Sequence, residues 1–133
     1  MKILICDDHK IVREGLKQIL HQLGDGTHIE EAGDGGEALA ILKGQRFDLL
    51  LLDISLPGMN GIEVLQKAKD RYSDLNVLML SMMPQEQYAI LALKLGASGY
   101  LTKDTASEEL LLAVRKISEG GKYISHALAE SLA

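Results

Sequence analysis

The sequence is poor in cysteine, with Cys6 as the single thiol among 133 residues. One cysteine excludes an internal disulfide and any metal site made of several cysteines. Cys6 lies in a short apolar segment near the N-terminus, where a small thiol ordinarily fills space in the core. We therefore expect Cys6 to contribute packing and no chemistry.

Long apolar runs are also missing. Although 47% of the residues are hydrophobic, no uninterrupted segment approaches the eighteen or so residues that a membrane-spanning helix needs. The first apolar segment is short, ends in two aspartates and lacks a small-residue cleavage site, which argues against a signal peptide. These absences predict a cytoplasmic protein. The 133 residues fit one domain that is long enough to bury a substantial core.

Positive charge is scarce, since 14 Lys and Arg stand against 19 Asp and Glu and give a net charge of −5. Surfaces that bind nucleic acid concentrate positive charge. The composition therefore argues against nucleic-acid binding by this domain alone.

Five short apolar segments alternate with five segments of helical periodicity. We expect the apolar segments to be strands over Ile3–Cys6, His28–Ala32, Phe47–Leu52, Asn76–Leu80 and Gly99–Leu101. The third is almost wholly apolar, which is typical of a central parallel strand covered on both faces. Strands that alternate with helices indicate βαβ units. The sequence thus predicts an α/β fold with a parallel sheet and five helices.

Helix starts are marked by capping residues. In three places an Asp, Asn or Thr stands three residues before a Glu, which is the spacing of a capping box. These pairs are Asp34 and Glu37, Asn60 and Glu63, and Thr105 and Glu108. A further helix is predicted from about Gln85 to Leu95.

Ionisable or hydroxylated side chains stand where the predicted strands end. Asp7 and Asp8 follow the first strand, Asp53 the third, Ser81 the fourth and Lys103 the fifth. Parallel α/β sheets bind ligands outside the carboxyl ends of their strands. We therefore expect three carboxylates, one hydroxyl and one ammonium to converge at one edge of the sheet.

Such a cluster of acids needs a cation. Two carboxylates about 4 Å apart repel by about 4 kcal/mol at an effective dielectric constant near 20, so one acid must be protonated or a cation must join them. Oxygen ligands in small number suit Mg²⁺, which completes its shell with water and phosphate oxygens. Lys103 and Ser81 can then hold the other phosphoryl oxygens while a carboxylate attacks phosphorus.

These residues and their spacing resemble the receiver domain of two-component response regulators. The matching elements are Asp7-Asp8, then Asp53 followed by Pro57-Gly58 and Gly61, then Ser81, then Gly99-Tyr100-Leu101-Thr102-Lys103. The resemblance covers about residues 2 to 121. It implies a doubly wound, flavodoxin-like sheet of five strands in the order 2-1-3-4-5, with five helices.

The resemblance also implies the residues of a phosphorylation site. Asp53 would be the phosphoacceptor and a ligand of Mg²⁺, and Asp8 would be a second direct ligand. Asp7 would support the ion through water, and Ser55 would supply its backbone carbonyl.

Three further residues match the family's phosphate-binding and switch positions. Lys103 would bind the phosphate, Ser81 would be the switch hydroxyl, and Tyr100 stands where the family has its rotating aromatic. One position departs from the pattern, because many receivers have a proline joined by a cis peptide after the lysine, whereas Asp104 follows here. A cis bond before a residue other than proline costs about 3 kcal/mol or more, so the geometry of this bond is in question.

The segment from Gly99 to Asp104 and the ending from Gly121 to Ser125 resemble the NarL/FixJ subfamily, whose members normally continue into a LuxR-type helix-turn-helix. The resemblance implies a sensor histidine kinase as phosphoryl donor, a homodimer formed on phosphorylation, and DNA contact only through an output domain absent from this sequence. We expect a receiver domain over residues 1–121 and the start of a linker over 122–133.

Other functions are less compatible with these residues. A haloacid-dehalogenase-type phosphatase needs a second Asp two residues after its nucleophile, and position 55 is Ser. A flavin-binding module needs a small polar loop after the first strand, where Asp7 and Asp8 would repel phosphate. A degenerate receiver that only docks partners would not need the complete set of charged groups. We therefore expect a phosphoacceptor and not a metabolic enzyme, and we interpret His9 as an exposed residue at a helix start.

Overall fold

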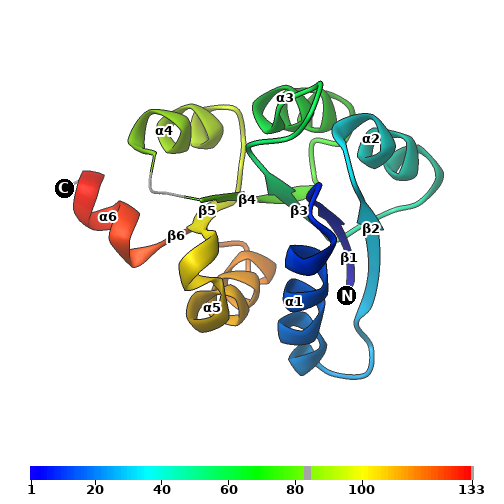
Figure 1. The fold of residues 1–133 in the computed structure, drawn as a ribbon, viewed down its shortest axis with the longest axis horizontal. Helices are drawn as coiled ribbons and strands as arrows, with labels where there is room; N and C mark the ends of the chain where they lie inside the picture. Colours follow the sequence, from blue (N-terminus) through cyan, green and yellow to red (C-terminus); the bar gives the residue numbers. More distant parts are fainter. Residues whose placement is uncertain (83–84, 133) are drawn as a thin grey trace.

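The computed structural model describes residues 1–82 and 85–132, with one parallel sheet between two layers of helices (Figure 1). The strands are β1 (Lys2–Cys6), β2 (His28–Ala32), β3 (Leu49–Asp53), β4 (Asn76–Ser81), β5 (Gly99–Thr102) and β6 (Tyr123–Ile124). The helices are α1 (Lys10–Leu20), α2 (Gly35–Gly44), α3 (Gly61–Arg71), α4 (Glu86–Lys94), α5 (Ala106–Ser118) and α6 (His126–Leu132). Two 3₁₀ turns, η1 (His21–Leu23) and η2 (Lys103–Thr105), follow α1 and β5.

The sheet has the order β2-β1-β3-β4-β5-β6, and all neighbouring strands are parallel. The predicted doubly wound α/β fold and the order of its first five strands are confirmed. The predicted count of five strands and five helices was too low, because β6 and α6 follow α5. With only two residues, β6 is too short to give an alternating pattern in the sequence.

The two faces of the sheet bury separate apolar clusters. Successive strand residues point to opposite faces, so Leu50 and Leu52 of β3 pack with α2, α3 and α4. Leu49 and Leu51 pack on the other face with α1 and α5. Figure 1 shows these two helical layers above and below the sheet. Burial on both faces explains why β3 is apolar at every position before Asp53.

None of the helices in the described ranges combines the length and the apolar character that crossing a bilayer requires.

Two of the three predicted helix caps are confirmed. Asp34 Oδ1 accepts a hydrogen bond from the Glu37 N–H at 2.8 Å, and Asn60 Oδ1 accepts one from the Glu63 N–H at 3.0 Å. The Thr105 cap was wrong. Its hydroxyl lies 2.9 Å from Thr102 Oγ1, because η2 precedes α5 and places Thr105 inside a turn.

Residues 122–132, which we call the C-terminal arm, dock on the body of the domain. The Tyr123 N–H donates to the Ser98 carbonyl at 3.0 Å, and the Ser125 N–H donates to the Tyr100 carbonyl at 2.9 Å. The Tyr123 hydroxyl donates to Glu109 of α5 at 2.7 Å. Leu128 is fully buried in the cluster that contains Tyr100 and the small residues of α4. The arm thus covers part of the surface formed by α4 and β5.

We predict that Leu128→Ala loosens the arm. Deleting a buried leucine side chain costs about 2–5 kcal/mol, and we expect about 2 kcal/mol here because the arm can undock as a unit. Urea unfolding measures this loss, and hydrogen exchange of the Ser125 amide should become faster. The exposed Glu130→Ala serves as a control on the same helix. Equal losses of stability in the two variants would contradict the docking of Leu128.

Candidate functional site

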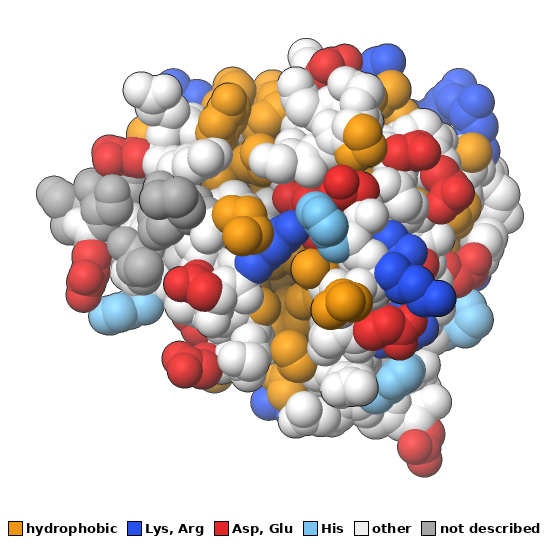
Figure 2. All heavy atoms as spheres, viewed as in Figure 1, with side chains coloured by type: hydrophobic (Ala, Val, Ile, Leu, Met, Phe, Trp, Pro, Cys, Tyr) orange, Lys and Arg blue, Asp and Glu red, His pale blue; other side chains and the backbone are white. Residues whose placement is uncertain are grey.

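The side chains singled out in the sequence lie at or just beyond the carboxyl ends of β1, β3, β4 and β5. These four strands are neighbours in the sheet, so their ends meet at one edge. Figure 2 shows acidic, basic and histidine side chains gathered near the middle of one face of the molecule.

Asp53 is the last residue of β3 and is 1% exposed. Its Oδ1 accepts a hydrogen bond from the Ser55 N–H at 3.1 Å, and its Oδ2 accepts one from Lys103 Nζ at 3.1 Å. The loop after Asp53 returns close to the strand, where the Gly61 N–H donates to the Ile54 carbonyl at 2.9 Å. A Cβ on Gly61 would collide with the Asp53 backbone carbonyl. Glycine at position 61 therefore allows the loop to fold against Asp53.

Lys103 joins two acids that are distant in the sequence. Its Nζ lies 2.8 Å from Asp7 Oδ2 and 3.1 Å from Asp53 Oδ2. Both carboxylates are buried, and the lysine side chain is only 12% exposed. No peptide bond within the described ranges is cis, so the bond between Lys103 and Asp104 is trans. The departure from proline at position 104 thus leaves Lys103 in contact with both acids.

Asp7 and Asp8 differ in their surroundings. Asp7 is fully buried, and its Oδ1 accepts a hydrogen bond from the backbone N–H of His9 at 2.8 Å. The Asp8 side chain is 31% exposed, and its Oδ1 lies 3.1 Å from His9 Nδ1. Each of these three residues offers a ligand atom within 4.8 Å of the others. Asp53 lies outside this set of three and is linked to Asp7 through Lys103.

His9 is exposed, as expected for a residue at a helix start, but its ring also contacts the acids. Its Nδ1 lies 3.5 Å from Asp7 Oδ1 in addition to its contact with Asp8. The residues around His9 do not have the spacing of a metal-binding motif, so no motif predicted the contact of the ring with the acids. Its position directly after the acidic pair was the only available signal.

Ser81 and Tyr100 lie on the adjacent strands β4 and β5. Ser81 ends β4 and is 3% exposed, and Tyr100 lies in β5 and is fully buried. The Tyr100 hydroxyl is buried and forms no hydrogen bond within the described residues. Burial raises the pKa of the Tyr100 phenol, and the nearby Ser81 side chain offsets part of that rise. The aromatic ring at the predicted switch position therefore already lies inside the domain.

The environment changes the ionisation of two residues in the site. Burial raises the pKa of Asp53 above its ordinary value, although Lys103 and the Ser55 N–H oppose the shift. The pKa of Lys103 is also raised, because the hydrogen bonds and charges of Asp7 and Asp53 outweigh the opposite effect of burial. Burial thus makes the Asp53 carboxylate costly, and Lys103 reduces that cost.

The raised pKa of Asp53 predicts a pH-dependent stability. Since the unfolded chain releases the Asp53 proton at lower pH than the folded chain, the free energy of unfolding should fall as pH rises from about 3.8 through the folded-state pKa. Asp53→Asn lacks this titration. Urea unfolding at several pH values should show the variant gaining stability over the wild type across that interval. A difference that shrinks as pH rises would contradict the raised pKa.

The donor set at this edge fits a divalent cation. Asp7, Asp8 and Asp53 offer carboxylate oxygens, which are the ligands that Mg²⁺ prefers. Lys103 is the one lysine or arginine of the described chain within 4 Å of their carboxylates, so two negative charges are left uncompensated when all three acids are ionised. Asp8 and Asp53 could ligate the ion directly, with Asp7 in support.

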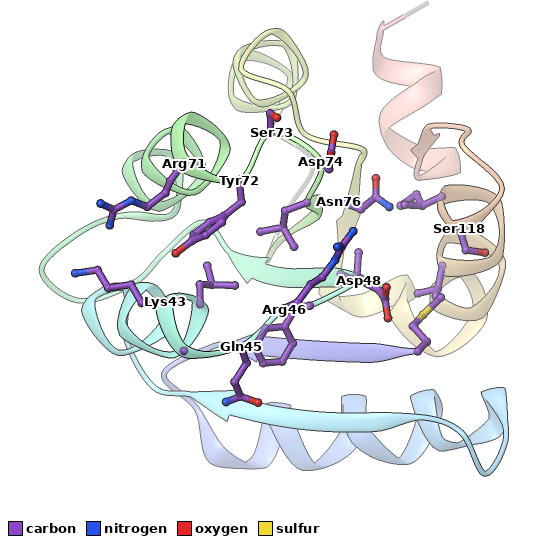
Figure 3. A pocket seen from close by; sticks show the side chains of 18 residues that line it. Lys43, Gln45, Arg46, Asp48, Arg71, Tyr72, Ser73, Asp74, Asn76 and Ser118 are labelled. Atoms are coloured by element: carbon purple, nitrogen blue, oxygen red, sulfur yellow. The ribbon is translucent and has the colours of Figure 1, made fainter.

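A separate hollow of about 730 Å³ lies at the opposite edge of the sheet, where β3 and β4 begin. Figure 3 shows Lys43, Arg46 and Arg71 lining it together with Asp48 and Asp74. Because side chains of both charge signs line it, the hollow favours no ligand charge. None of the carboxylates at the other edge lines it.

Comparisons with known proteins agree with the geometry. The family model described as response regulator receiver domain matches residues 3–115. Nitrate/nitrite response regulator protein NarL of Escherichia coli (strain K12) is 37% identical over 131 residues, which are 98% of this chain and 61% of that protein. Transcriptional regulatory protein DegU of Brevibacillus brevis is 36% identical over 132 residues, 99% of this chain and 56% of that protein. The chain thus spans about three fifths of the length of these relatives.

Solved structures resemble the chain over nearly its whole length. A LuxR-family two-component response regulator from Aurantimonas sp. SI85-9A1 matches with a TM-score of 0.91 and 32% identity, covering 97% of this chain and 92% of that one. A CheY-like receiver domain protein from Methanospirillum hungatei JF-1 matches with a TM-score of 0.82 and 31% identity, covering 90% and 94%.

Proposed function

The chain belongs to the response regulator receiver domains, among the regulators of NarL and LuxR type, and from this premise we propose that it is a signalling switch phosphorylated on Asp53. The observation that carries the proposal is the ion pair of Lys103 with both Asp7 and Asp53. This ion pair brings the ends of β1, β3 and β5 together in one charged site. Phosphoryl transfer depends on positioned groups and on charge stabilisation, which such a site can provide.

We assign the nucleophile to Asp53. One Asp53 oxygen forms the new bond to phosphorus while the bond to the donor's leaving group breaks and that group keeps the electron pair. Lys103 Nζ contacts the Asp53 carboxylate. The ammonium group can therefore hold an oxygen of a phosphoryl group bound to Asp53. Bound Mg²⁺ would supply further neutralisation of the phosphoryl charge, with Asp8 and Asp53 as ligands, Asp7 in support through water, and the Ser55 carbonyl as a backbone ligand.

We further propose that Ser81 and Tyr100 report the phosphorylation. Ser81 ends the strand next to β3, where its hydroxyl can bind a phosphoryl oxygen. A movement of Ser81 would change the packing around the neighbouring buried Tyr100 ring. The Tyr100 carbonyl holds the C-terminal arm through Ser125, which gives the site a physical connection to the arm. Phosphorylation would then shift an equilibrium between two arrangements of this surface.

The partners follow from the same proposal. A sensor histidine kinase would supply the phosphoryl group, and a homodimer would form on phosphorylation. DNA would be bound only through an output domain connected by residues 122–133. Residue 133 lies outside the described residues. We assign residues 1–121 to the receiver. The predicted linker then begins with the C-terminal arm, which docks on the receiver. The chain would be a phosphoacceptor with slow self-dephosphorylation and not a metabolic enzyme.

Acetyl phosphate tests this proposal directly. With Mg²⁺ present, intact-mass spectrometry should detect the gain of one phosphoryl group per chain, and with a chelator it should detect none. Labelling that is independent of Mg²⁺ would contradict the metal-assisted site, and a gain of two groups would contradict a single acceptor.

A further inference from the structure

We propose that His9 is a direct ligand of the metal ion and makes the site bind transition metals such as Co²⁺ better than carboxylates alone would. The proposal rests on the metal site assigned above and adds a nitrogen donor to it. It concerns which divalent ion the site prefers. Carboxylates alone would suit Mg²⁺.

The positions of the donor atoms carry the argument. Two ligands at 2.0–2.1 Å from an octahedral ion and at right angles to each other lie about 3 Å apart. His9 Nδ1 lies 3.1 Å from Asp8 Oδ1 and 3.5 Å from Asp7 Oδ1. The nitrogen therefore stands at the separation expected for a neighbouring ligand of Asp8 on the same ion. In the described ranges, this is the one group of three such side chains close enough to share a metal.

The backbone helps to hold the ring in this place. The His9 N–H donates to Asp7 Oδ1 at 2.8 Å, which ties the His9 backbone to the buried acid. His9 is the residue before the first turn of α1 and has extended backbone angles, φ −104° and ψ 113°. Its side chain is 67% exposed, so the ring is reached by ions from solvent without opening the core.

The chemical consequence is a change in selectivity. Mg²⁺ gains little from imidazole, whereas Co²⁺, Ni²⁺ and Zn²⁺ bind imidazole well. A site in which an imidazole joins the carboxylates should therefore favour these ions over Mg²⁺ more strongly than a site of carboxylates alone. Loss of the ring should reduce transition-metal affinity and leave Mg²⁺ affinity nearly unchanged.

Titrations of the whole chain with Co²⁺ and with Mg²⁺ test this. In His9→Ala we expect Co²⁺ affinity to fall by at least about tenfold and Mg²⁺ affinity to change by less than roughly threefold. The proton NMR spectrum of the wild-type Co²⁺ complex should contain imidazole resonances displaced by the paramagnetic ion, and these should be absent in the variant. His9→Gln is a second variant that keeps a long polar side chain.

His28→Ala is the matched control, because the His28 ring also lies near a carboxylate, at 3.4 Å from Glu30, but away from the acidic pair. It should change neither affinity. An unchanged ratio of Co²⁺ to Mg²⁺ affinity in both His9 variants, or no displaced imidazole resonance, would overturn the role of His9 while leaving the phosphorylation site intact. A wild-type chain that binds neither ion would overturn the metal site itself.

Discussion

Asp53→Asn is expected to abolish labelling by acetyl phosphate, leaving no phosphorylated protein above background in the presence of Mg²⁺. The amide keeps the size and position of the side chain but offers no carboxylate oxygen to attack phosphorus. The loss should not arise from unfolding. Because burial raises the pKa of Asp53, the ionised acid is costly in the folded state, and the variant should be at least as stable as the wild type at neutral pH.

Asp25→Asn is the matched control for this experiment. Asp25 lies in the exposed turn between η1 and β2, so the substitution removes the same charge far from the buried acids. It should be labelled as fully as the wild type. Persistent labelling of Asp53→Asn would show that another residue accepts the phosphoryl group.

Asp8→Ala is expected to reduce Mg²⁺ affinity by at least about tenfold, because it removes the most exposed carboxylate of the site. The folded protein without metal should lose little stability, since the substitution also removes a negative charge close to Asp7. Isothermal titration calorimetry measures the affinity, and urea unfolding with a chelator measures the stability. The two readouts separate a metal ligand from a structural acid.

Asp25→Ala changes the net charge by the same amount and should leave Mg²⁺ affinity within about twofold of wild type, because solvent and salt screen distant exposed charges. If Asp8→Ala behaved like this control, Asp8 would have to be removed from the metal site. If it lost several kcal/mol of stability instead, its role would be structural.

The sequence predicted the fold well because its strongest signals are local. The apolar segments and the alternation with helices placed all five main strands, and β3 could be identified as central from its composition alone. The site residues could be located for a related reason. In a parallel sheet the end of a strand fixes the edge at which a side chain lies, so Asp7, Asp53 and Lys103 were placed together without knowledge of their contacts.

The remaining features depend on contacts that no local pattern encodes. β6 is formed by two residues that pair with β5 only because α5 returns the chain to that edge. The Thr105 cap was wrong because η2 precedes α5 and turns the hydroxyl toward Thr102. The contact of the His9 ring with two carboxylates depends on the side-chain rotamer, which the sequence does not reveal. Tertiary geometry thus decided each of these cases.

We propose that the Asp53 carboxylate attacks phosphorus at a site that depends on Mg²⁺, and the position of the phosphorylated residue tests this most directly. After labelling with acetyl phosphate, borohydride reduction converts an acyl phosphate of aspartate to homoserine, and peptide mass spectrometry locates the modified residue. We expect homoserine at position 53 alone, formed with Mg²⁺ and not with a chelator. Homoserine at position 7 or 8, or equal amounts at position 53 with and without Mg²⁺, would contradict it.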